Sequence, residues 1–263
     1  MEFTRHAVEL GPRPSGSEAN RQLQAYILAQ LKTCKCEVTQ DSFMANGPSV
    51  ASRAVPMTNI LARFPGRSGR AIVITGHFDT KLFPGRKFVG ASDGGSSTGL
   101  LLELARVLTG QPRVDDVYLV WFDGEEAFGE WTNSDKLWGS RHLADKWQKD
   151  GTLRRVKALI NVDMIGDRDL NIQREVSGNR ALNILVWNTA KELGHARNFI
   201  DQDIEIDDDH RPFIERGVPA IDLIDFDYAP WHSDADTLDK LSAQSLEIVG
   251  TVVDEVIRRL ERQ

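Results

Sequence analysis

The chain has 263 residues, of which 41% are hydrophobic and 27% are charged, and its formal net charge at pH 7 is −7. This balance is typical of a globular protein, and the acidic charge argues against a general nucleic-acid binder, which would carry a basic face. No apolar run reaches the roughly 18 residues of a membrane span, and the first residues lack the apolar core of a signal peptide. We therefore expect no membrane span, and either a cytoplasmic protein or one whose leader has been removed.

The N-terminal part of the chain predicts one amphipathic helix and one polar strand. Apolar residues at helical spacing indicate a helix over Ser17–Lys32, which Ser17 can cap. A polar strand is expected at Glu37–Phe43, followed by a loop over residues 45–56, which is rich in turn residues. Cys34 and Cys36 are one residue apart, a spacing that seldom allows good disulfide geometry. We expect both cysteines to be structural.

From residue 59 onward, apolar runs alternate with helical patterns. The strands are expected at Asn59–Phe64, Ala71–Thr75, Val117–Phe122, Val156–Val162 and Ala220–Ile224. The helices are expected at Gly99–Leu108, Arg141–Gln148, Ala181–Leu193, Pro212–Arg216 and Leu246–Leu260. The alternation predicts an α/β fold with a mixed, largely parallel central sheet and helices on both faces. Because no linker-like segment divides the chain, we expect residues 1–263 to form a single catalytic domain.

Histidines and carboxylates follow the ends of these strands or precede a helix. In open α/β sheets, ligands bind outside the carboxyl ends of the strands, so these residues should meet at one edge. They are His77, Asp79, Asp93, Glu125, Glu126, Asp163 and, a few residues beyond the last strand, His232. Two histidines with several carboxylates are zinc-ligand chemistry, and a catalytic zinc uses three protein ligands. The adjacent Glu125 and Glu126 suggest that one binds the metal while the other acts as a base.

The motifs around these residues resemble those of the zinc aminopeptidase superfamily, which includes the glutaminyl cyclases. The resemblance spans about Gly11 to Leu241 and rests on Gly-His77-Phe-Asp79, Gly-Ala-Ser-Asp93, Phe-Asp-Gly-Glu125-Glu126 and Asp163-Met-Ile-Gly. Several features look more like a cyclase than a peptidase. These are Trp131 after Glu-Glu-Ala-Phe, the run Asp208-Asp-His210-Arg-Pro-Phe, and Trp231 directly before His232.

Carried over by position, the resemblance implies one zinc ion held by Asp93, Glu126 and His232. Glu125 would be the general acid/base, and Asp163 and Asp208 would form a carboxylate network beside it. Trp131 and Trp231 would shape the substrate pocket, while His77, Asp79 and His210 would support the ligands from behind. The implied reaction is cyclisation of an N-terminal glutamine to pyroglutamate with release of ammonia, on peptide or protein substrates. Relatives of this kind are commonly exported, which favours a periplasmic or secreted location.

Two other functions stay open. A two-zinc aminopeptidase would use His77, Asp93, Glu126, Asp163 and His232 as its ligands, so the residue types alone do not separate it from a cyclase. A non-catalytic binding domain is disfavoured because Glu125 is present. The sequence also departs from the animal cyclases: Asp207 stands where they tend to have an amide, and Gly76 and Thr98 occupy the positions of their cysteine pair.

Overall fold

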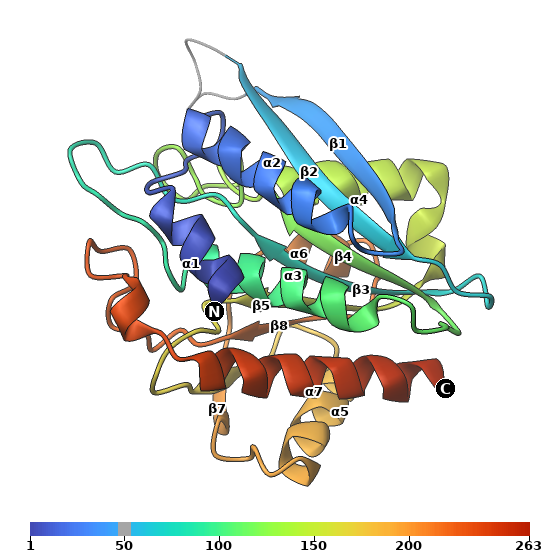
Figure 1. The fold of residues 1–263 in the computed structure, drawn as a ribbon. Helices are drawn as coiled ribbons and strands as arrows, with labels where there is room; N and C mark the ends of the chain where they lie inside the picture. The colour runs from blue at the N-terminus through green and yellow to red at the C-terminus, as the bar shows by residue number, and fades with distance from the viewer. Residues whose placement is uncertain (47–53) are drawn as a thin grey trace.

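The central feature of the fold is an eight-stranded mixed sheet, seen in a computed structural model that describes residues 1–46 and 54–263 (Figure 1). The strand order is β1-β2-β4-β3-β5-β8-β6-β7. The strands are β1 (Glu37–Ala45), β2 (Val55–Phe64), β3 (Ala71–His77), β4 (Asp116–Phe122), β5 (Val156–Asp163), β6 (Ile172–Glu175), β7 (Phe199–Ile204) and β8 (Ala220–Ile224). The four central strands β4, β3, β5 and β8 are parallel to one another. The antiparallel pairs are β1 with β2, β2 with β4, and β6 with β8. The predicted α/β fold with a mixed, largely parallel sheet is confirmed.

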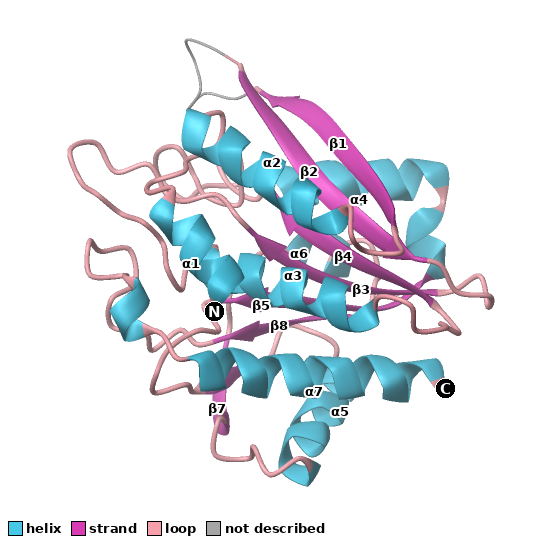
Figure 2. Ribbon diagram, viewed as in Figure 1, coloured by secondary structure: helices cyan, strands magenta, loops and turns pink. Residues whose placement is uncertain are grey.

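Helices cover both faces of this sheet (Figure 2). They are α1 (Glu2–Glu9), α2 (Glu18–Leu31), α3 (Gly95–Leu108), α4 (Trp138–Asp150), α5 (Arg180–Glu192), α6 (Arg211–Ile214) and α7 (Ala243–Glu261), with short 3₁₀ turns at Thr152–Arg155 and Leu238–Lys240. One apolar core joins α1, α2, α3, α5 and α7 to the sheet, and a second joins α4 and α6 to the opposite face. In β3, Ile72 and Ile74 belong to the first core and Val73 to the second, because successive side chains point to opposite faces. Burial on both faces explains why the central strands are continuous apolar runs.

Three elements were not predicted from the sequence: α1, β6 and β7. Helix α1 lies against α3, where Gly99 allows the close approach, since a Cβ atom there would lie 2.9 Å from Thr4 N. Strands β6 and β7 are short, and β7 is largely polar and exposed. Their sequences do not distinguish them from loops, because pairing with the sheet decides their conformation.

The boundaries of three predicted segments also differ. Helix α3 begins at Gly95 and α4 at Trp138, earlier than the apolar pattern indicated. The loop predicted over residues 45–56 is shorter, since β1 extends to Ala45 and β2 starts at Val55; residues 47–53 of that loop lie outside the described part of the chain. Strands β2 and β3 follow one another in the sequence but are separated in the sheet by β4.

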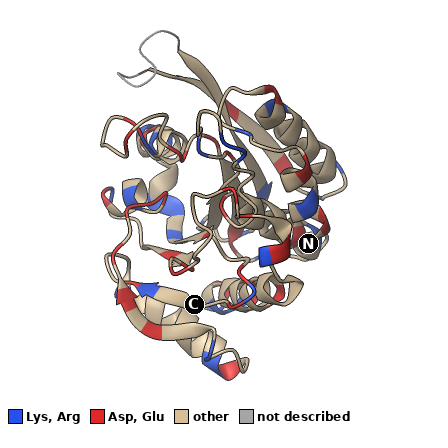
Figure 3. Ribbon diagram, turned by 90° about the vertical axis from the view of Figure 1, so that its left-hand side faces the viewer, with Lys and Arg blue, Asp and Glu red and all other residues tan. Residues whose placement is uncertain are grey.

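Three further properties of the fold concern membrane-spanning helices, the cysteines and the distribution of charge. In the described residues, no helix has both the length and the apolar character needed to cross a bilayer. Cys34 and Cys36 are free thiols that are partly buried against the first core. Figure 3 shows Lys and Arg interspersed with Asp and Glu along the ribbon in that view, so charge lies in small local groups.

Candidate active site and metal centre

The predicted site residues meet at the carboxyl ends of the four central strands. His77 is the last residue of β3, Asp163 is the last residue of β5, and Glu125 lies in the loop after β4. Asp93 comes two residues before α3, and His232 lies in the loop after β8. The structure therefore brings together residues that are far apart in the sequence, as the positions of the strand ends predicted.

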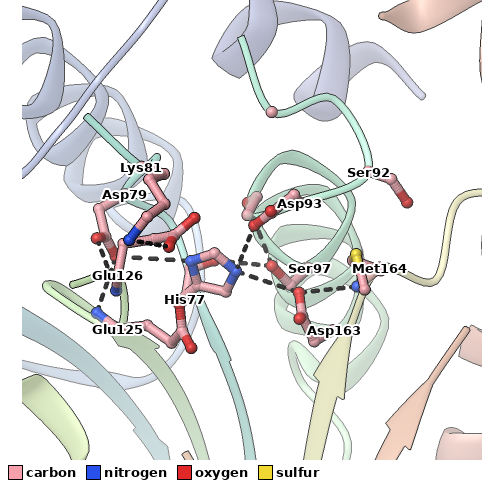
Figure 4. A network of polar contacts seen from close by, with 12 residues as sticks. His77, Asp79, Lys81, Ser92, Asp93, Ser97, Glu125, Glu126, Asp163 and Met164 are labelled. Carbon is pink, nitrogen blue, oxygen red and sulfur yellow. Dashed lines mark hydrogen bonds and ion pairs between the residues drawn. The ribbon is translucent and has the colours of Figure 1, made fainter. Parts of the chain in front are cut away.

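His77 lies at the centre of a buried group of carboxylates (Figure 4). Its Nε2 atom is 3.1 Å from Asp93 Oδ1 and 3.1 Å from Asp163 Oδ1, and its Nδ1 atom is 3.5 Å from Asp79 Oδ1. Burial alone would lower the pKa of His77, but Asp163, followed by Asp79 and Asp93, raises it well above the usual value. The three carboxylates therefore favour the charged form of the imidazole.

A second group shares Asp93 with the first. His232 Nε2 lies 3.4 Å from Asp93 Oδ2 and 3.2 Å from Glu126 Oε1. The ligand atoms of these three residues lie within 4.8 Å of one another, as do those of His77, Asp93 and Asp163. Burial lowers the pKa of His232, but the hydrogen bonds and charges of Asp93 and Glu126 outweigh this effect and raise the pKa to about 9.

The Asp93–Glu126–His232 group fits a zinc ion. One imidazole and two carboxylates are a donor set that zinc accepts. Glu126 Oε2 is buried and has no hydrogen-bond partner within the described residues, and the nearest cation, Lys81 Nζ, is 3.7 Å away. Burial, followed by the charge of Asp93, raises the pKa of Glu126. A bound cation would relieve this repulsion.

The backbone holds several of these side chains in place. Asp79 accepts hydrogen bonds from the backbone N–H groups of Glu125 and Glu126, at 3.1 and 3.3 Å. Gly94 follows Asp93 with φ at 74°, and a Cβ atom there would lie 2.6 Å from Asp79 O, so the turn requires glycine. His232 itself has φ at 51°, a strained value for a non-glycine residue that functional sites often contain.

Glu125 is poised to hold a proton. Its side chain is buried in the loop after β4. Burial raises the pKa of Glu125 well above its usual value; His77 opposes this shift, whereas Glu126, Asp208 and Asp209 add to it. A carboxyl group with a raised pKa can act as a general acid as well as a base.

Further carboxylates lie behind this edge. Burial raises the pKa of Asp163 to about 7; His77 opposes this, and Asp208 and Asp93 contribute to it. Asp208 is buried next to Asp222 of β8, whose pKa is raised well above the usual value by burial and by the charge and hydrogen bond of Asp208. Asp222 also accepts a hydrogen bond from Asn161 at 3.1 Å. Sequence reasoning missed Asp222 because it lies inside an apolar strand rather than at its end.

A cavity of about 510 Å³ opens above these groups. It is lined by carboxylates of the site and by Trp131, Phe226 and Trp231 among others. Both tryptophans remain about 40% exposed, and Trp231 stacks on His232 with ring centroids 4.3 Å apart. Trp131 donates its indole N–H to Asp207 Oδ2 at 3.4 Å. The cavity therefore has an acidic floor and aromatic walls.

The structure does not bring His210 to the cavity. His210 is buried at the start of α6, with Nε2 3.3 Å from Glu175 Oε2. In contrast, Asp236 supports the site without having been singled out. It accepts hydrogen bonds from the N–H groups of Ser92 at 2.8 Å and of Asp93, and from the Tyr228 hydroxyl at 2.7 Å. Only its position in the short run after His232 could have drawn attention to it.

The chain is similar to known proteins over most of its length. Residues 59–257 match the family described as Peptidase family M28. A glutaminyl-peptide cyclotransferase from Drosophila melanogaster is 30% identical over 90% of this chain and 75% of its own length. The solved structure of an Acidobacteriales bacterium glutaminyl cyclase is 38% identical, with a TM-score of 0.93 over 99% of this chain and 93% of that one. For the Fimbriiglobus ruber glutaminyl cyclase, the identity is 27%, the TM-score 0.89 and the coverage 97% and 92%.

Proposed function

This chain belongs to peptidase family M28 and, within it, to the glutaminyl cyclases, and we propose that it converts the N-terminal glutamine of peptides into pyroglutamate. The observation that carries the proposal is the position of Glu125, whose pKa burial raises well above its usual value, in the cavity that Asp93, Glu126 and His232 also line together with Trp131 and Trp231. The similarity to enzymes named as glutaminyl cyclases supports the same reaction.

The proposed cofactor is one zinc ion held by Asp93, Glu126 and His232. Zinc at this position would act as a Lewis acid toward the side-chain carbonyl of the substrate glutamine. His77 and Asp79 would support the ligands, because His77 contacts Asp93 and Asp79 binds the backbone of Glu126. These contacts orient metal ligands and maintain the charge state of the site.

In the proposed reaction, the α-amino nitrogen of the glutamine attacks its own side-chain carbonyl carbon. Glu125 accepts the proton that the amine loses and delivers a proton to the departing amide nitrogen, which leaves as ammonia. One C–N bond forms and one breaks, so the net products are a pyroglutamyl peptide and ammonia. Because both reacting groups belong to one residue, the protein gains most by holding the folded conformer in place.

The other predicted residues would control protons and water. Asp163 and Asp208 are buried and line the same cavity as Glu125, and the charge of Asp208 raises the pKa of Glu125. Trp131 and Trp231 would cover the substrate and exclude water from the cavity they line. In this proposal, His210 has no direct role, since it does not line the cavity.

A two-zinc aminopeptidase is the second candidate. The His77–Asp93–Asp163 group, which shares Asp93 with the first, supports it because two-metal sites bind adjacent ions through shared ligands. In such an enzyme, Glu125 would activate a water molecule rather than the substrate amine. Its product would be a free N-terminal amino acid.

The test is to incubate the zinc-loaded protein with a Gln-initiated dipeptide amide and, separately, with a Leu-initiated one, and to follow both by mass. Loss of ammonia from the first with the second intact is the expected result. Release of free leucine without ammonia loss would overturn the cyclase and favour the aminopeptidase. The expected periplasmic or secreted location stays a prediction, which fractionation of the producing cells would test.

A further inference from the structure

A second, smaller cavity lies beside the catalytic one. Its volume is about 300 Å³, and it is formed by the loop before α4, by α4 itself and by α6. Its charged lining residues are Lys136, Arg141, Asp207, Arg211, Glu215 and Arg216. Asp207 lines both cavities, so the two share a wall. The small cavity therefore adjoins the catalytic cavity at Asp207.

The cations of this cavity outnumber the carboxylates that neutralise them. Lys136 pairs with Asp207, and Arg216 pairs with Asp145 at 2.5 Å and with Glu215 at 4.0 Å. Among the described residues, the Arg141 guanidinium donates only to the backbone carbonyls of Asn133 and Lys136, at 2.6 and 3.5 Å. Within residues 1–46 and 54–263, the Arg211 guanidinium makes no ion pair and no side-chain hydrogen bond.

The positive charges act on one another. Lys136 is 8% exposed, and its pKa is lowered first by burial and then by the charges of Arg141 and Arg211. Two guanidinium groups thus act against the ammonium, whereas the charges of Glu215 and Glu125 and the ion pair with Asp207 favour it. An anion bound in the cavity would relieve this repulsion, and planar guanidinium groups are suited to bidentate carboxylate or phosphate binding.

We propose that this cavity is a substrate subsite that binds the carboxylate of a Glu or Asp residue located downstream of the N-terminal glutamine. The inference rests on the proposed function, because it needs a peptide whose first residue occupies the catalytic cavity. An extended peptide advances by about 3.3–3.6 Å per residue, and in this proposal one of its second to fourth residues reaches the shared wall at Asp207. Arg211, which has no carboxylate of its own, would be the main contact.

The experiment compares Gln-initiated tetrapeptide amides that differ only in having Glu or Gln at positions two, three or four. At low ionic strength, we expect the zinc-loaded enzyme to show a kcat/KM about five- to tenfold higher for the best acidic peptide, mostly through KM. The preference should fall with added NaCl, because salt screens partly exposed charges. It should also fall with inorganic phosphate, which competes for the same guanidinium groups.

The variant R211E should abolish or reverse the preference for acidic peptides. In the described part of the chain, the Arg211 side chain makes no hydrogen bond or ion pair that the substitution would remove, and R211Q gives a milder change at the same position. The matched control is R154E, which changes the net charge equally at an exposed residue following α4. Its ratio of acidic to neutral kcat/KM should equal that of the wild type.

Two results would overturn the subsite: equal kcat/KM for acidic and neutral peptides in the wild-type enzyme, or an unchanged preference in R211E. Both leave the cyclase intact, provided that the neutral peptides lose ammonia. If no Gln-initiated peptide loses ammonia, the proposed function itself is wrong. The two proposals can therefore fail separately.

Discussion

Asp236 Oδ2 accepts a hydrogen bond from the backbone N–H of Asp93 at 3.2 Å, across 143 positions of sequence. Its other oxygen accepts from Ser92 N at 2.8 Å. The buried carboxylate thus holds the turn that presents Asp93 to both candidate metal groups. The orientation of the shared ligand depends on a side chain from the loop that also carries His232.

The variant D236N should weaken zinc binding. Its amide NH₂ would face a backbone N–H group, so one of the two hydrogen bonds to the turn is lost. Changes to groups that orient metal ligands lower affinity by about 10- to 100-fold. Competition with a chromogenic chelator measures this, with D234N as the control in the same loop. Equal zinc affinities for D236N and wild type would contradict the positioning role.

The variant E125Q should bind zinc but lose turnover. The amide is close in shape to the carboxyl group and leaves the proposed ligands intact, but it cannot exchange a proton with substrate. Removal of a general acid/base lowers rates by about 10²- to 10⁴-fold. Zinc content and ammonia release measure the two properties, and E130Q, an exposed position of the same loop, is the control. A turnover near the wild-type rate would remove Glu125 from the mechanism.

Replacing each histidine in turn should separate one metal from two. If the single zinc lies between Asp93, Glu126 and His232, then H232A loses it, whereas H77A retains about one equivalent with reduced affinity. Metal content after dialysis is the measurement, with H195A as a control away from the cavity. A wild-type content of two ions, falling to one in H77A, would favour the aminopeptidase.

Trp131 and Trp187 should behave differently when replaced by alanine. Trp131 is 40% exposed and lines the cavity, so W131A should raise KM and lower kcat/KM. The expected loss of transition-state binding free energy is about 1–3 kcal/mol, with little effect on stability. Trp187 packs edge-on against Phe199 at 5.5 Å and donates to Ile200 O, so W187A should mainly destabilise the fold. Kinetics and urea unfolding of both variants test this. If W131A mainly lowers stability, Trp131 is a packing residue.

Asp225 should make stability depend on pH. Burial, with Asp227 and Asp167, raises the pKa of Asp225 to about 8, compared with about 3.9 for an unfolded chain. The folded state thus binds more protons between these values, and its stability falls as pH rises through that window. The variant D225N can still accept the hydrogen bond from Asn171 N. Because the wild type loses stability as the pH rises from 5 to about 8.5 and D225N does not lose this contribution, the stability of D225N relative to wild type should increase over that range. Thermal unfolding at both pH values measures the difference, and D239N is the exposed control.

Much of the fold follows from local sequence patterns, because the central strands are buried on both faces. Val117–Phe122 and Ala220–Ile224 were recognised as apolar runs, and both are strands. The start of α3 was missed because its first turn contains Ser96, Ser97 and Thr98. All three are buried, and their hydroxyls donate to backbone carbonyls, so burial there does not require apolar residues.

Local sequence patterns predicted a residue of the candidate site only where that residue ends a strand or precedes a helix. His77 and Asp163 were found in this way, since chain order places them at one edge of the sheet. The contacts of Asp236 with Asp93, and of Lys136 with Asp207, join segments whose proximity no local pattern encodes. Long-range pairs of this kind depend on the packing of loops, which only the structure supplies.

The exposed edge strand β7 bears on how these molecules behave at high concentration. An open edge offers unpaired backbone groups to another chain, and native proteins protect such edges with charge. In β7, Asp201 and Asp203 are exposed on one face, where Arg174 of β6 lies 2.6 Å from Asp201. Two copies meeting edge to edge would bring these carboxylates together. The acidic edge should therefore discourage strand-to-strand aggregation, and its neutralisation would promote it.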